Sequence, residues 1–133
     1  MSVFVLDSNI VSFYIRQNEK VIQNVRDALL DGHEVIISPI AYYEVKRGLL
    51  AIKAEKRLKE FIALCKVFSV GQLDNSVLDY AADIYCELRN SRQTIEDADM
   101  LSAAFCVRHD FILVTNNLMH FKIISGLRYC DWA

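Results

Sequence analysis

Residues 2–9 read Ser-Val-Phe-Val-Leu-Asp-Ser-Asn, a short apolar run that ends in an acid. The apolar part, Val3–Leu6, has three counterparts that are equally brief and rich in β-branched or aromatic residues: Val35–Ser38, Val67–Val70 and Phe111–Thr115. None of the four alternates with polar residues, which is typical of strands buried on both faces of a parallel sheet. We therefore expect four strands in one covered sheet.

Between these runs, apolar residues recur every three or four positions, as on one face of a helix. Three such stripes occur: Ala54, Leu58, Phe61 and Cys65; Val77, Leu78, Ala81, Ala82, Tyr85 and Leu88; and Met100, Leu101, Ala104, Phe105 and Val107. Ser38-Pro39 predicts another helix start, with serine as N-cap and proline in the first turn. Strands that alternate with helices indicate an α/β fold, with a central parallel β-sheet flanked by α-helices.

The length and composition fit one domain over residues 1–133, with enough apolar surface for a real core. The net charge of −2 is not that of a general nucleic-acid binder, which usually carries a basic excess. Positive charge is nevertheless concentrated between Glu44 and Glu60. That segment is either a solvated helical face or a patch that contacts phosphates, and the sequence leaves both open. Its basic residues are Lys46, Arg47, Lys53, Lys56, Arg57 and Lys59.

The cellular compartment is predicted from the lack of a signal segment or membrane span and from the cysteines. The N-terminal residues show no basic segment followed by a long apolar one, and no apolar run approaches the ~20 residues that cross a bilayer. The four cysteines form no CxxC pair and lie among apolar neighbours. We expect a cytoplasmic protein with buried, reduced thiols and no membrane association.

Two acids occupy positions that suit a functional site. Asp7 directly follows the first expected strand, and the carboxyl ends of parallel strands are where α/β sheets bind ligands. Asp7 could instead be a turn or N-cap residue, although Ser8 or Asn9 could serve as the cap. Glu44 lies beside the apolar stripe of its helix, where a carboxylate needs a metal or an ion pair, with Lys46 or Arg47 the available partners.

A third acidic group, Glu96-Asp97-Ala98-Asp99, precedes an apolar helix. Thr94-x-x-Asp97 has the spacing of a capping box, which explains Asp97 without a functional role. Asp99 is less well explained by capping, and we assign it to the site. The last expected strand ends in Thr115-Asn116-Asn117, short polar residues that orient water or phosphate or simply form a turn.

If Asp7, Glu44 and Asp99 converge to about 5 Å, each pair repels by roughly 3 kcal/mol at an effective dielectric of 20. A divalent cation is the simplest way to offset that repulsion. Oxygen ligands without clustered His or Cys select Mg²⁺ or Mn²⁺ over zinc. Such an ion would bind a phosphate oxygen and lower the pKa of bound water, which suits phosphodiester hydrolysis.

These motifs, taken together, resemble a known family. LDSN, SPIAYYEVKRG, IEDADMLSAA and LVTNNLMHF followed by GLRYCDW are similar in order and spacing to the PIN-domain ribonuclease toxins of VapBC toxin–antitoxin systems, the VapC family. The resemblance covers essentially the whole chain. It implies a three-layer PIN-like fold and Mg²⁺-dependent endonucleolytic cleavage of structured RNA, commonly tRNA, which inhibits translation. It also implies that the metal-binding and catalytic acids are Asp7, Glu44 and Asp99.

The resemblance further implies a cognate VapB-type antitoxin that covers the site, a homodimer, and a toxin–antitoxin hetero-oligomer. Supporting positions around the site are Ser8, Asn9, Asp97, Thr115 and Asn117. One departure is that Asn117 stands where a fourth acid is frequent, so a second metal ion would be held more weakly. His120 matches a recurrent His-Phe pair, and we expect it to pack and form a hydrogen bond rather than catalyse.

Three other functions fit the sequence less well. A phosphoacceptor receiver domain needs paired acids after the first strand and a late lysine, and a dehalogenase-type phosphatase needs a second acid where Asn9 stands. The chain meets neither requirement. The strongest alternative is a PIN-like module that binds RNA or protein without cutting, which the three acids disfavour and Asn117 keeps open.

Overall fold

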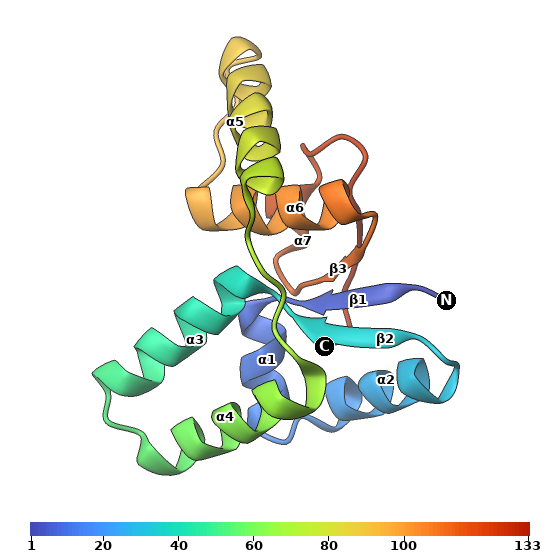
Figure 1. Cartoon of the computed structure of the whole chain (residues 1–133), viewed down its shortest axis with the longest axis vertical. Coiled ribbons are helices and arrows are strands. Elements are labelled where there is room, and N and C mark those ends of the chain that lie inside the picture. The colour runs from blue at the N-terminus through green and yellow to red at the C-terminus, as the bar shows by residue number, and fades with distance from the viewer.

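The computed structural model describes all 133 residues and has four strands and seven helices (Figure 1). In chain order they are β1 (Val3–Leu6), α1 (Ser8–Ile15), α2 (Glu19–Leu30), β2 (Glu34–Ile37), α3 (Pro39–Ala51), α4 (Glu55–Phe68), α5 (Asn75–Asn90), α6 (Asp97–His109), β3 (Ile112–Val114), α7 (Leu118–Phe121) and β4 (Arg128–Cys130). No helix is both long enough and apolar enough to pass through a bilayer.

The four strands form one parallel sheet in the order β2-β1-β3-β4. β1 is central: Leu6 pairs with Ile37 of β2 on one side and with Val114 of β3 on the other. Since all strands run in the same direction, their carboxyl ends share one edge of the sheet. Asp7 and Thr115 follow two adjacent strands, so this register brings together residues 108 positions apart.

Both faces of the sheet are buried, as the unbroken apolar runs predict. Successive strand residues enter two separate cores: Val5 and Leu113 belong to one, and Leu6 and Val114 to the other. Helices α1 to α4 supply the second core, and α5, α6 and α7 supply the first (Figure 1). The predicted α/β architecture, a central parallel sheet with helices on both faces, is confirmed.

The predicted start of α3 is also confirmed. Ser38 is the N-cap, and its hydroxyl oxygen accepts hydrogen bonds from the backbone N–H groups of Ile40 at 3.2 Å and Ala41 at 3.3 Å. Pro39 is the first helical residue, where its missing N–H costs nothing. Ser38 itself is fully buried, so this cap fixes α3 directly against the carboxyl edge of the sheet.

One predicted strand is wrong. Val67 and Phe68 are the last residues of α4, and Val70 makes only an isolated bridge to Ile37. Phe68 is buried at the helical spacing from Leu64, whereas Val67 is 74% exposed. The apolar run is therefore the end of an amphipathic helix. The fourth strand is instead β4, which the sequence analysis did not identify.

Helix α5 differs from the sequence-based expectation in two ways. On α5 the buried positions are Val77, Ala81, Ile84 and Leu88, while Leu78 and Tyr85 of the predicted stripe are exposed. All four cysteines are free, but only Cys106 is buried as expected: Cys65 and Cys130 are partly exposed, and Cys86 is exposed. It lies on the outer surface of α5, which projects beyond the rest of the molecule (Figure 1).

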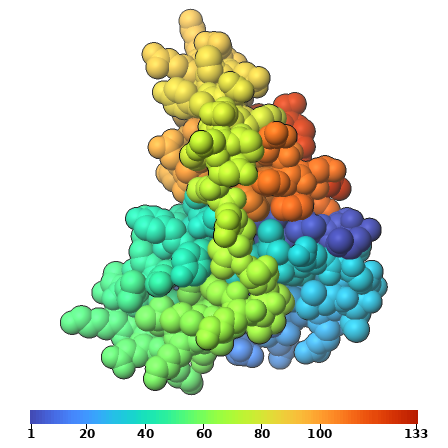
Figure 2. All heavy atoms as spheres, viewed as in Figure 1, coloured from blue at the N-terminus to red at the C-terminus, as the bar shows by residue number.

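The segment between α4 and α5 crosses the front of the molecule as a narrow strip (Figure 2). Gly71 lies in this strip against the aromatic ring of Phe105, and a Cβ at that position would collide with the ring. Glycine therefore allows the strip to lie close to α6, which carries Asp99 into the same edge of the sheet.

Candidate active site

Asp7 is the structural centre of the site. It is only 4% exposed, and its backbone N–H donates to the Val114 carbonyl at 2.9 Å, which continues the β1–β3 ladder. One carboxylate oxygen, Oδ1, accepts from the Ser8 N–H at 2.9 Å. The other, Oδ2, accepts from the Thr115 hydroxyl at 2.9 Å. Asp7 is thus the N-cap of α1, one of the roles that the sequence left open for it, and it is also buried at the carboxyl edge.

The pKa of Asp7 is shifted by its burial and by neighbouring groups. Burial raises the pKa of Asp7 above its usual value, and the negative charges of Asp99 and Glu44 raise that pKa further. The hydrogen bonds from the Ser8 amide and the Thr115 hydroxyl act in the opposite direction. The charges of Glu44 and Asp99 thus act on Asp7 from distant parts of the sequence, while the metal-binding role assigned to the three acids stays a prediction.

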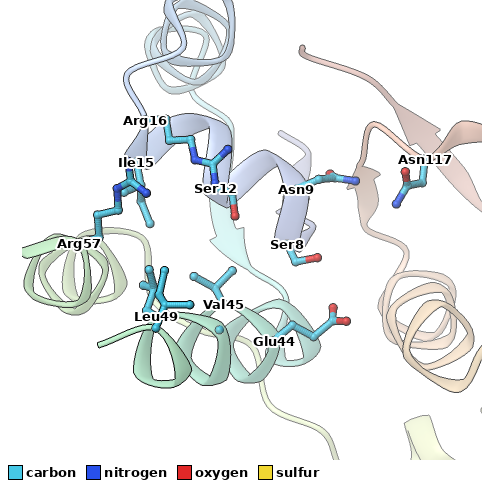
Figure 3. A pocket seen from close by; sticks show the side chains of 12 residues that line it. Ser8, Asn9, Ser12, Ile15, Arg16, Glu44, Val45, Leu49, Arg57 and Asn117 are labelled. Atoms are coloured by element: carbon cyan, nitrogen blue, oxygen red, sulfur yellow. The ribbon is translucent and has the colours of Figure 1, made fainter. Parts of the chain in front are cut away.

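Glu44 extends from α3 toward this edge (Figure 3). Its side chain is 27% exposed and lies 4.0 Å from the guanidinium of Arg47, the outer limit of an ion pair. Arg47 also lies over the ring of Tyr43, and Lys46 donates to the Tyr42 hydroxyl at 3.3 Å. Neither base therefore neutralises Glu44 closely, and its carboxylate stays available at the site.

Asp99 approaches from the first turn of α6. Its Oδ2 lies 2.9 Å from Nδ1 of His120, so His120 makes the hydrogen bond that we expected. Asp97 does not form the predicted capping box, because α6 begins at Asp97 and its N-cap is Glu96, which makes no side-chain bond. Asp97 is exposed and remains a favourable acid in the first turn.

The polar residues named from the sequence lie around Asp7. Thr115 is fully buried, and its hydroxyl oxygen accepts from the Asn117 N–H at 3.1 Å while donating to Asp7. The side-chain carbonyl of Asn9 accepts from the Asn116 N–H at 3.2 Å. These bonds tie the start of α1 to the loop after β3, so the two segments are held as one unit.

A groove of about 400 Å³ opens from this unit between α1, α3 and α4 (Figure 3). Ser8, Asn9, Glu44 and Asn117 lie at one end of it, and Arg16 and Arg57 lie at the other. Arg57 is the one member of the basic segment that lines the groove. Arg16 was missed, since a single arginine at a helix end carries no recognisable pattern in a sequence.

The donor set at this edge suits a hard divalent cation. Asp7, Glu44 and Asp99 offer carboxylate oxygens, while Ser8 and Asn117 add neutral oxygens, and no cysteine or clustered histidine competes. No three acidic, histidine or cysteine side chains lie close enough together to form a complete ligand set, and Asp99 is turned toward His120. The chemistry of the residues thus fits Mg²⁺ or Mn²⁺, whereas preassembled coordination is not present.

Comparison with known proteins agrees with the fold. The family model described as "PIN domain" matches residues 4–126. The tRNA(fMet)-specific endonuclease VapC of Shigella flexneri is 26% identical over 135 residues, covering 100% of both chains. The ribonuclease VapC2 of Rickettsia felis is 24% identical, covering 98% of each chain.

Among solved structures, a crystal structure of VapBC2 from Rickettsia felis bound to a fragment of its promoter DNA superposes with a TM-score of 0.88 at 22% identity. The match covers 98% of this chain and 99% of that one, so the fold is shared from end to end. Family model, full-length relatives and fold agree with the motifs read from the sequence, and the chain therefore belongs to the PIN-domain family, among its VapC members.

Proposed function

We propose that this chain is a Mg²⁺-dependent endoribonuclease toxin of a type II toxin–antitoxin system, acting as one PIN domain over residues 1–133. Its substrate class is structured RNA, with tRNA as the leading candidate, and cleavage would inhibit translation. The observation that carries the proposal is Asp7: a buried carboxylate at the carboxyl end of the central strand, under the charges of Glu44 and Asp99. The names of the VapC relatives support the activity and the tRNA class.

Asp7, Glu44 and Asp99 are the residues that would hold the metal ion, with Mn²⁺ able to substitute. When bound, the ion supplies Lewis-acid chemistry to the scissile phosphate and a more acidic water. Thr115 and the Ser8 amide hold Asp7 in one orientation, so its oxygens need no reordering when substrate arrives. Glu44, half-buried and weakly paired, would ligate the ion or orient the attacking water.

A VapB-type antitoxin is the proposed partner, together with a homodimer and a toxin–antitoxin hetero-oligomer. The structural neighbours support this, since the Rickettsia felis structure is of VapBC2 and another neighbour is a toxin–antitoxin complex from Klebsiella pneumoniae. The exposed apolar side chains of this chain are compatible with burial in such assemblies, Leu78 and Tyr85 of α5 among them.

The test is cleavage of bulk tRNA by the purified chain during Mg²⁺ and Mn²⁺ titration, with EDTA as the metal-free arm. We expect Asp7→Ala and Asp99→Asn to abolish cleavage and keep the fold. Asp83→Asn, an exposed acid on α5, is the matched control and should cut normally. If the wild-type chain cuts no RNA and neither ion raises its melting temperature, the enzymatic proposal fails and the non-catalytic binding module takes its place.

A further inference from the structure

Arg16 and Arg57 form a pair of cations that the site chemistry does not use. Arg16 is the C-cap of α1 and Arg57 lies in the first turn of α4, yet both side chains line the same end of the groove (Figure 3). Neither has an acid within 4.0 Å, because the ion pairs of the chain are Arg47–Glu44, His120–Asp99 and Arg128–Asp110. The groove thus ends at two guanidinium groups without a counter-charge.

The charge along the groove changes sign from one end to the other. Glu44 is the one acid that lines it, and it lies beside Ser8, Asn9 and Asn117 at the end next to Asp7. The remaining lining is uncharged and mostly apolar, from Ser12, Ile15, Val45, Gly48, Leu49 and Ile52. A ligand that follows this groove therefore leaves the acidic end, passes an uncharged stretch and meets two positive charges.

We propose that Arg16 and Arg57 bind a backbone phosphate of the RNA strand at a fixed distance from the bond that is cut. The inference rests on the proposed function, which places the scissile phosphate at the acidic end. An RNA strand seated there carries a further negative charge at every nucleotide, so its continuation along the groove brings one to the arginines. Guanidinium groups match phosphate oxygens by forked, two-point hydrogen bonds, which favours phosphate as the occupant.

The length of α1 sets the spacing. Arg16 follows Ser8 by eight residues, which is about 12 Å along a helix axis at a rise of 1.5 Å per residue. The phosphate that the arginines bind should consequently lie at one fixed position, within a few nucleotides of the cut, and the arginine pair would set the position of the substrate strand in the groove.

Binding is measured on the Asp7→Asn background, so that RNA stays intact, with bulk tRNA as the probe over a series of salt concentrations. Replacing both arginines, Arg16→Gln with Arg57→Gln, should lower the slope of log K against log salt by about 1 for each phosphate that the variant no longer binds. The matched control is Lys56→Gln with Lys59→Gln, which removes two exposed charges from the same helix outside the groove. An equal change in both double variants would overturn the proposal.

A second measurement leaves the protein unchanged. Once the cut is mapped, single neutral methylphosphonates are placed at successive positions on either side of it in an RNA hairpin. We expect one position, within a few nucleotides of the cut, to weaken binding to the arginine-containing chain and to have no effect in the double arginine variant. An equal loss of affinity at all positions, or a loss that does not depend on the arginines, refutes the proposed phosphate contact.

The two proposals fail in different ways. If the wild-type chain cuts no RNA, the proposed function fails, while the salt slopes still show whether the arginines contact phosphate. If cutting is normal and the arginine variants bind RNA as before but lose affinity for a co-expressed antitoxin, the pair belongs to a protein interface. That outcome rejects the phosphate assignment and leaves the nuclease assignment standing.

Discussion

Replacing Thr115 by valine removes the one side-chain hydrogen bond to Asp7 while nearly preserving shape. The Thr115 hydroxyl donates to the buried Asp7 carboxylate at 2.9 Å and is itself fully buried, so water cannot readily replace it. A hydrogen bond to a charged group contributes about 1.5–3 kcal/mol. We expect the free energy of unfolding at pH 7 to fall by about that amount, as measured by urea denaturation.

Thr115→Ser is the control, because it keeps the hydroxyl and loses one methyl group, a change of about 0.8 kcal/mol. The difference between the two variants should shrink at low pH. The Thr115 bond lowers the pKa of Asp7, so it contributes most when Asp7 is ionised and less after Asp7 is protonated. Equal losses in the valine and serine variants, or a difference that does not change with pH, would refute this account.

Three further predictions concern other single positions. Asp7→Asn should raise the melting temperature of the metal-free chain at neutral pH. Burial raises the folded-state pKa of Asp7 above its unfolded value near 3.8, so wild-type stability falls as pH rises from the unfolded-state pKa through the folded-state pKa. The gain in melting temperature should therefore vanish at lower pH, where Asp7 is protonated in both states. A variant less stable than wild type at pH 7 would contradict it. His120→Ala should change stability little, since the side chain of His120 is 54% exposed. It should raise the Mg²⁺ concentration for half-maximal cleavage roughly tenfold, because the hydrogen bond that orients Asp99 is removed. An unchanged Mg²⁺ titration would argue against this role of His120. Ser38→Ala should cost about 1 kcal/mol in thermal or urea unfolding through loss of the α3 cap, whereas a loss within error would mean that the cap is dispensable.

The strands that carry the site could be predicted from the sequence because each is apolar on both faces. Val3–Leu6 and the runs near residues 35 and 112 become β1, β2 and β3, and the acid or hydroxyl after each was identified with them. The strand predicted at Val67–Val70 is wrong for a definite reason. A short, largely apolar segment such as Val67–Val70 is equally consistent with a buried strand and with the last turn of an amphipathic helix. Only the burial of Phe68 together with Leu64 decides between them.

β4 was missed because Arg128–Cys130 is three residues long and lies at the sheet edge, where its first residue is exposed. Such a strand owes its conformation to pairing with β3 rather than to its own pattern. The N-cap of α6 was predicted at Thr94 but lies at Glu96, because the spacing of a capping box does not by itself determine where a helix begins. Arg16 shows the same limit at the site, because its role depends on which groove its helix end faces.

The bond between Asp7 and Thr115 also bears on when this protein becomes dangerous to the cell that makes it. A nascent chain that has exposed β1 through α6 already contains Asp7, Glu44 and Asp99, but it lacks the strand that anchors the first of them. Pairing β3 beside β1 closes a loop of about a hundred residues, which is slow compared with local helix formation. The ribosome must therefore release nearly the whole polypeptide before β3 can anchor Asp7, and we expect chains terminated ahead of β3 to be inactive.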